Sequence, residues 1–243
     1  MKLNSRLDIT TLARDFRQYP KMHIRSILDD YDAKALYKEI TAPQRWNFVF
    51  QVNGRHYDLD PEGWRNMAVE DQLKTQQIVH AHASEGFTYI HYLLPIYDRY
   101  HGGGDLTPGL KQFFEFLNGE EFLNFMRTLT GAHDIAYADA QLTRLGPGHF
   151  ITIHNDDIEG KNRRAAYVLN MTPEWQEDWG GYLNFYDDIG NIEAGFKPAF
   201  NALNVFTVPA RHSVSVVAPF AQQSRYVISG WLRAGENPAV NRA

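Results

Sequence analysis

Hydrophobic residues follow a different period in each half of the chain. In the first 133 residues they recur every three to four positions over the stretches 8–40, 68–82 and 110–129, which is the spacing of an amphipathic helix. Pro43 closes the first stretch. The apolar face of the third stretch consists of Phe113, Phe114, Leu117, Phe122, Phe125, Met126 and Leu129. The pattern predicts helices over all three stretches.

Two segments between these helices have other patterns. Residues 47–59 alternate apolar and polar positions around Asn53-Gly54, the favoured dipeptide of a two-residue turn, so a β-hairpin is predicted. Residues 87–100 are rich in aromatic side chains, among them Tyr89, Tyr92 and Tyr97. Such runs most often pack in a core, and the wall of a peptide groove is the alternative.

The second half of the chain has the pattern of a β-rich fold. From Ile135 onward, short runs of β-branched and aromatic residues are separated by turn signals such as Gly180-Gly181 and the segments 145–148 and 189–191. These turns delimit at least seven candidate strands without intervening helices. This order favours an antiparallel sandwich or barrel over a parallel α/β sheet.

Composition narrows the chemistry that the chain can use. The 243 residues are 44% hydrophobic and 22% charged, as in packed globular proteins. The net charge is −5 and the basic residues are scattered, so nucleic acid is not an expected partner. The chain has no cysteine, and any metal must therefore be held by His, Asp or Glu. No signal-peptide core or membrane-spanning stretch is present, which predicts a cytoplasmic protein without a membrane partner.

Three residues are candidate metal ligands. Residues 150–156 have the pattern of a strand, in which His154 and Asp156 would share one face while Asn155 points away. His212 lies in a later predicted strand, 211–217, on the face of Val214 and Val216. Two histidines and a carboxylate can hold Fe(II) and leave three coordination positions open. An HxD pair alone is a weak signal, and a lone histidine beside valines is more often a core residue.

Arg225 adds a second kind of evidence. In the predicted strand 224–231 it shares a face with Val227, Ser229 and Trp231. An arginine inside a small barrel needs an anion, because a buried unpaired charge costs about 3–5 kcal/mol. The distal carboxylate of 2-oxoglutarate would satisfy it. The alternative is a surface arginine or one paired with a protein carboxylate, and the order HxD, His, Arg favours the first interpretation.

The region 134–233 resembles the 2-oxoglutarate- and Fe(II)-dependent dioxygenases of the prolyl hydroxylase type, and within them the ribosomal-protein prolyl hydroxylases. The similar motifs are residues 154–157, 163–169, 173–175, 180–183 and 224–231. The resemblance implies a mainly β fold with a double-stranded β-helix (jelly-roll) core buttressed by N-terminal helices. We therefore expect a single domain over 1–243, with a helical support region and hairpin at 1–133 and the catalytic core at 134–234.

The resemblance also implies roles for individual residues. His154, Asp156 and His212 match the iron ligands, and Arg225 matches the residue that binds 2-oxoglutarate. Ser229 matches a small hydroxyl residue near the iron. Leu183 matches a wall of the co-substrate pocket, although a core residue after an ordinary glycine turn is equally compatible. The implied cofactors are Fe(II), 2-oxoglutarate and O2, with ascorbate as an optional reductant.

Two departures from the family pattern leave questions open. Members often place a tyrosine before the first ligand as another co-substrate contact, whereas this chain has Thr143-Arg144 there and Tyr137 further upstream. Arg144 is either a replacement contact or a solvent-facing residue. The ribosomal-protein branch commonly has a second, degenerate jelly roll after the first, yet this chain ends twelve residues past Trp231. We therefore expect one catalytic domain, and the substrate of the branch is not carried over directly.

The predicted activity is hydroxylation of a prolyl residue in a protein, with release of succinate and carbon dioxide. Asp156 favours hydroxylation, since a small residue at this position would open a site for halide. Two alternatives remain at this point: hydroxylation of a free amino acid or other small metabolite, and a noncatalytic cupin-like jelly roll that binds a metal or sugar. The oligomeric state has no signal in the sequence.

Overall fold

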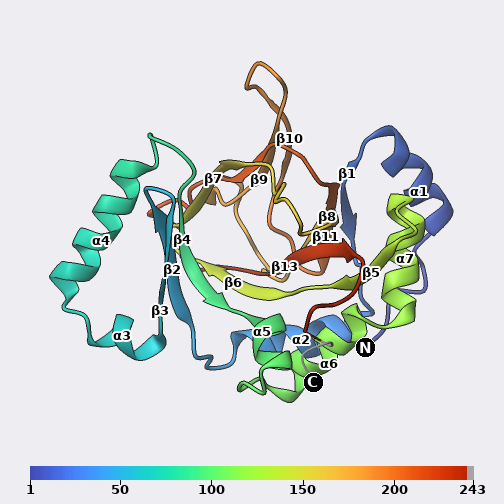
Figure 1. Cartoon of the computed structure of the whole chain (residues 1–243), viewed down its shortest axis with the longest axis horizontal. Coiled ribbons are helices and arrows are strands. Elements are labelled where there is room, and N and C mark those ends of the chain that lie inside the picture. Colours follow the sequence, from blue (N-terminus) through green and yellow to red (C-terminus); the bar gives the residue numbers. More distant parts are fainter. Residues whose placement is uncertain (240–243) are drawn as a thin grey trace.

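A computed structural model describes residues 1–239, and its strands form one extensive antiparallel sheet that curls into a nearly closed barrel (Figure 1). The strand order along the main path is β1-β11-β8-β13-β6-β4-β7-β12-β9-β10. The jelly-roll fold predicted for the second half is confirmed. Its strands are β5 (Ile135–Ala138), β6 (Gln141–Leu145), β7 (Phe150–His154), β8 (Arg163–Asn170), β9 (Leu183–Tyr186), β10 (Ile192–Phe196), β11 (Ala202–Thr207), β12 (His212–Val214) and β13 (Arg225–Ala234).

The N-terminal region contains more strands than the sequence indicated. The stretch 8–40 is not continuously helical: α1 (Ile9–Gln18) is followed by β1 (Lys21–Arg25) and then α2 (Asp30–Thr41). Pro20 explains the interruption, because the residue before a proline is disfavoured in the helical region and Tyr19 is extended. Strand β1 then pairs with β11 along its whole length.

The predicted hairpin is present as β2 (Asn47–Val52) and β3 (Arg55–Leu59). Asn53 and Gly54 both have positive φ, 51° and 72°, as a type I′ turn requires. The aromatic segment divides into β4 (Tyr89–Leu94) and the short helix α5 (Ile96–His101). Strand β4 pairs with β2, β6 and β7 and so joins the hairpin to the barrel.

The remaining helices cover two sides of the sheet (Figure 1). Helices α3 (Pro61–Asn66) and α4 (Val69–His82) lie beside the hairpin, and α4 confirms the helix predicted over 68–82. The stretch 110–129 forms two helices, α6 (Pro108–Leu117) and α7 (Glu120–Thr130), because the chain is extended at Gly119. A 3-10 turn, η1 (Glu177–Trp179), precedes β9.

Two hydrophobic clusters set the position of the site. The larger one joins α1, α2, α6 and α7 to the outer face of the sheet and includes Phe113, Phe122 and Leu203. A second cluster fills part of the barrel interior around Phe185 and Phe206. Between residues 1 and 239, no helix is long and apolar enough to cross a membrane.

Candidate metal centre

His154 and Asp156 converge through a turn rather than through strand alternation. Strand β7 ends at His154, and Asp156 has a φ of 63°, in the left-handed region that aspartate adopts more readily than most residues. The prediction of one strand through residue 156 is therefore wrong. Asn155 is exposed, as predicted, and its side chain accepts a hydrogen bond from the Asp157 amide. This turn directs the Asp156 carboxylate back toward the His154 ring.

His212 reaches the same place from the opposite strand. It lies directly across from His154 in the antiparallel pair of β7 and β12, and the two ring centroids are 4.1 Å apart. The strand predicted over 211–217 is shorter than expected and ends at Val214. Val214 is buried near His212, whereas Val216 is 49% exposed and does not continue that face.

The three side chains form a compact group with one open side. Asp156 Oδ1 lies 3.5 Å from His154 Nε2, and Asp156 Oδ2 lies 3.4 Å from His212 Nε2. The ligand atoms all lie within 4.8 Å of one another, and the described residues contain no other such group of three or more His, Asp or Glu side chains. The donor set and spacing fit a divalent first-row metal held on one face.

Backbone contacts fix the histidines in the form that a metal requires. His154 Nδ1 lies 2.9 Å from the carbonyl of Thr152, and His212 Nδ1 lies 2.7 Å from that of Ala210. A carbonyl can only accept, so each Nδ1 carries the proton and each Nε2 offers its lone pair. Burial lowers the pKa of His212 to about 4, and its ring is therefore neutral at pH 7.

Asp156 is ionised in this setting. Burial acts to raise its pKa, but contacts with the His154 and His212 side chains outweigh that effect, and the pKa is lowered. With two neutral imidazoles and one carboxylate, a site that holds a divalent cation has a net charge of +1. Such a cation can still attract an anionic chelating ligand.

Arg225 is the most unusual side chain in the barrel. It is 1% exposed, and no carboxylate pairs with it among residues 1–239. One terminal nitrogen donates to Asn170 Oδ1 at 3.2 Å, whereas Nε and Nη1 have no hydrogen-bond partner. Burial lowers its pKa to about 10, so it stays charged at neutral pH. Two unpartnered donors on a buried cation fit the carboxylate of an anionic ligand.

Arg225 and the three candidate ligands line one narrow cavity inside the barrel. The predicted alternation along β13 is present, because Val227, Ser229 and Trp231 line the same cavity. Leu183 also lies in its wall, opposite Val214 in the β9–β12 pair. The cavity therefore brings together every residue that the sequence singled out for the site.

The open question about a further co-substrate contact has a structural answer. The Arg144 guanidinium lies over the rings of Tyr92, at 4.2 Å, and Trp46, at 5.3 Å, so it points away from the cavity. Tyr137 packs against Arg233 and does not line the cavity either. Thr143, on the face of β6 opposite to Arg144, does line it, and its buried hydroxyl has no partner.

Sequence reasoning missed the contact of Arg163 with the metal centre. The Arg163 guanidinium lies 3.5 Å from the centroid of the Trp231 ring and donates to the carbonyl of Asp156 at 2.8 Å. It also lies 3.9 Å from Asp156 Oδ1. Arg163 begins β8 and Trp231 lies on β13, so the contact depends on strand pairing that no local motif reveals.

An open groove of about 610 Å³ lies over the exposed side of His154 and Asp156. Alternate residues of β4 and of the segment just before it form one wall: Phe87, Tyr89, His91 and Leu93. His56 of the hairpin hydrogen-bonds to the Tyr89 hydroxyl through Nδ1 at 2.6 Å. Within the aromatic segment, Tyr89 lines this groove, whereas Tyr92 packs in the hydrophobic cluster around Phe48.

The match to known families falls on this part of the chain. Residues 140–233, which include the three candidate ligands and Arg225, match the model of the 2OG-Fe(II) oxygenase superfamily. This segment belongs to that superfamily. Oxygenase relatives include the prolyl 3-hydroxylase OGFOD1 of Xenopus laevis, which is 31% identical over 119 residues. The same enzyme of Mus musculus is 36% identical over 85 residues.

These matches cover 46% and 32% of this chain but only 23% and 15% of the relatives, so the chain spans less than a quarter of their length. Solved structures with the same fold include a prolyl-4-hydroxylase of Pseudomonas putida, with a TM-score of 0.61, 14% identity, and coverage of 93% of this chain and 99% of that one. A 2OG-Fe(II) oxygenase of Burkholderia pseudomallei has a TM-score of 0.60 and 13% identity, and the coverage is 98% and 96%.

Proposed function

We propose that this oxygenase hydroxylates a prolyl residue in a protein or peptide, using Fe(II), 2-oxoglutarate and O2. The observation that carries the proposal is the buried Arg225 guanidinium, which has two unpartnered donors in the cavity that also contains the open-sided group of His154, Asp156 and His212. A noncatalytic metal-binding jelly roll has no use for such a cation. A dicarboxylate that chelates the metal and extends to Arg225 accounts for both features.

His154, Asp156 and His212 would hold the iron through Nε2 and carboxylate oxygens, and Arg225 would hold the distal carboxylate of 2-oxoglutarate. When bound, iron and 2-oxoglutarate supply the oxidising chemistry with O2, yielding succinate, carbon dioxide and a hydroxylated product. Ser229 and Leu183 would line the co-substrate pocket between these groups.

The other residues of the site orient the ligands and exclude water. The Thr152 and Ala210 carbonyls hold the imidazole rings in one tautomer. Asn170 holds the Arg225 guanidinium in place before the co-substrate arrives, which reduces the ordering cost of binding. Leu183, Phe206 and Val214 present apolar side chains to the cavity and limit the access of water.

The prolyl substrate is proposed from the relatives and from the groove. The two curated relatives are named prolyl 3-hydroxylases, and a solved structure of similar fold is a prolyl hydroxylase of Trichoplax adhaerens in complex with a peptide fragment, with a TM-score of 0.56 and 14% identity over 93% of this chain and 89% of that one. The open groove beside His154 has room for an extended chain. The position of the hydroxyl on the proline ring, a cytoplasmic location and stimulation by ascorbate are further predictions.

The test measures succinate formation from 2-oxoglutarate with Fe(II), with and without prolyl peptides, for wild type, His154→Ala and Arg225→Ala. We expect peptide-stimulated turnover in the wild type and its loss in both variants. Free proline is the matched alternative substrate. Stimulation by proline but not by peptides would replace the protein substrate with a small metabolite, and an intact protein that binds no iron and forms no succinate would overturn the proposal.

A further inference from the structure

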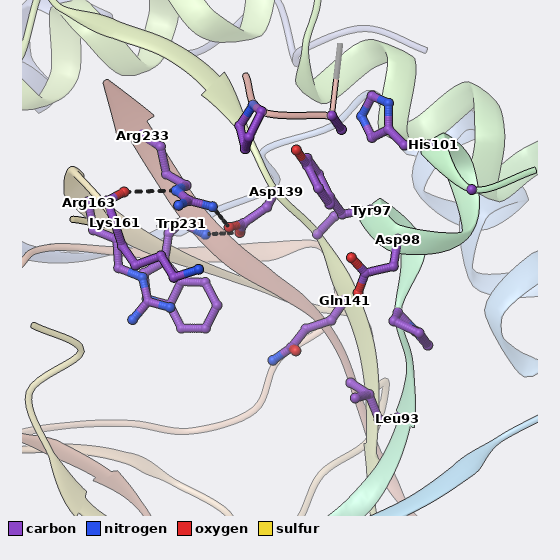
Figure 2. A pocket seen from close by; sticks show the side chains of 15 residues that line it. Leu93, Tyr97, Asp98, His101, Asp139, Gln141, Lys161, Arg163, Trp231 and Arg233 are labelled. Atoms are coloured by element: carbon purple, nitrogen blue, oxygen red, sulfur yellow. Dashed lines mark hydrogen bonds and ion pairs between the residues drawn. The ribbon is translucent and has the colours of Figure 1, made fainter. Parts of the chain in front are cut away.

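A second cavity, of about 570 Å³, lies beside the substrate groove (Figure 2). Its walls come from α5, the start of β6, the segment 161–163 and the end of β13. The cavity and the groove share four lining residues, Leu93, Gln141, Arg163 and Trp231. The two spaces are therefore neighbouring arms of one cleft that meet beside the metal centre, since Gln141 and Trp231 also line the inner cavity.

One wall of this second arm is rich in positive charge. Figure 2 shows Lys161, Arg163 and Arg233 grouped around Trp231. Arg233 is neutralised by Asp139 at 3.3 Å, and that partly buried carboxylate also accepts the Trp231 backbone N–H at 2.7 Å. The Arg163 guanidinium is held against Trp231 and the Asp156 carbonyl.

Lys161 differs from these two arginines. It is exposed, and within residues 1–239 no carboxylate lies within ion-pair distance of its ammonium group. It follows Asp156 by five residues, on the loop that leads into β8, and it lines the second cavity. Asp98 on α5 lies on the opposite wall, so the charge of the arm is divided between its two sides (Figure 2).

We propose that this cavity is a second arm of the substrate cleft in which Lys161 binds the carboxylate of an aspartate or glutamate close to the target proline. The inference rests on the proposed prolyl hydroxylase function and gives it a sequence preference. An exposed lysine contributes modestly to affinity, and its effect is greatest when the partner charge is fixed in position by binding elsewhere on the same molecule. A peptide that places its proline over the metal meets that condition.

The experiment uses the iron-loaded full chain and a library of peptides with one proline and randomised residues on both sides. Hydroxylated products are sequenced by mass spectrometry. We expect enrichment of Asp and Glu over Asn and Gln at one offset on one side of the proline. For peptide pairs that differ only by Glu or Gln at this offset, KM should differ about three- to fivefold with kcat unchanged, and the difference should shrink in high salt.

Charge reversal provides the sharper comparison. Lys161→Glu should lose the preference for Glu and accept a peptide with Lys at the same offset, while Asp98→Asn should tighten binding of the Glu peptide. Lys34→Glu, an exposed change on α2, is the matched control and should behave as the wild type. Hydroxylated peptides without any acidic preference, or a preference that survives Lys161→Glu, would overturn the inference while leaving the function intact. If no library member is hydroxylated, the proposed function fails with it.

Discussion

The two ends of the catalytic cavity are built in different ways. At the inner end, Arg225, Asn170 and Thr143 come from the paired strands β13, β8 and β6, and all three are buried. At the outer end, the groove is walled by a turn at Asp156, a loop and the N-terminal strand β4. Regular strand pairing fixes the inner side chains, whereas the outer ones depend on segments distant in sequence.

This difference suggests a division of labour. A co-substrate shared by many enzymes needs an invariant, dry pocket, and a buried cation in a sheet provides one. A substrate that differs between enzymes is better bound by loops, because loop sequences can change with little effect on the core. The predictions below test whether the inner and outer ends respond differently to substitution.

The largest expected effect comes from Arg225→Met at the inner end. Loss of the guanidinium should raise KM for 2-oxoglutarate by about 30-fold or more, since removing one partner of a buried charge pair costs about 2–5 kcal/mol. The same change should raise the thermal midpoint of the protein without co-substrate, because an unpaired buried charge is removed. Calorimetry and 2-oxoglutarate titration measure the two effects, and Arg225→Lys is the control that keeps the charge. A lower thermal midpoint with an unchanged KM for 2-oxoglutarate would show that Arg225 is structural.

The second effect is a dependence of protein stability on pH that arises from the buried His149 side chain. His149 is buried beside Phe48, and its Nδ1 accepts the Gly146 N–H at 3.2 Å. Burial lowers its pKa to about 3. The native state therefore stays unprotonated while the unfolded state binds a proton below its ordinary pKa of about 6.5. Stability should fall as the pH drops from 6.5 toward 3, with a contribution on the order of 3 kcal/mol at pH 4 from this residue.

Urea unfolding of the metal-free protein between pH 7 and 4 measures this loss of stability at acidic pH. His149→Gln keeps an acceptor but cannot be protonated, so its free energy of unfolding should depend less on pH than that of the wild type. Equal slopes in wild type and His149→Gln would contradict the assignment of a neutral buried ring.

Arg163→Gln tests the connection between the two ends. It removes the donor to the Asp156 carbonyl and the cation over Trp231, which together stabilise the left-handed turn. Outer contacts of metal ligands commonly affect metal affinity by 10- to 100-fold, and we expect about tenfold weaker Fe(II) binding. Anaerobic metal titration measures it, with Arg164→Gln as the neighbouring control because Arg164 pairs with the exposed Asp134. Unchanged Fe(II) affinity in Arg163→Gln would show that Arg163 does not support the metal ligands and contributes only to the walls of the substrate groove.

The same contrast explains what the sequence could predict. Arg225 and Ser229 were found because the side chains of β13 alternate regularly between its two faces. The hairpin was found because Asn53-Gly54 strongly favours a two-residue turn with positive φ at both positions. Strand β1 was missed because its apolar spacing continued that of the helices on either side. The contact of Arg163 with Trp231 arises only when β8 pairs with β13, and no spacing within either strand indicates it. Local periodicity therefore predicts which face a side chain takes, but not what it meets there.

The smallest expected effects separate two adjacent residues of β6. Thr143 faces the inner cavity with an unpartnered hydroxyl, and Arg144 faces the rings of Trp46 and Tyr92. Thr143→Val replaces the hydroxyl with a methyl group of similar volume. KM for 2-oxoglutarate should rise about tenfold, which is the effect of losing one hydrogen bond to a charged group. Arg144→Met should leave that KM within about twofold, since its stem still packs on the rings. A larger increase in KM for Arg144→Met than for Thr143→Val would place Arg144 in the co-substrate pocket. The two faces of β6 would then not separate co-substrate contacts from packing contacts.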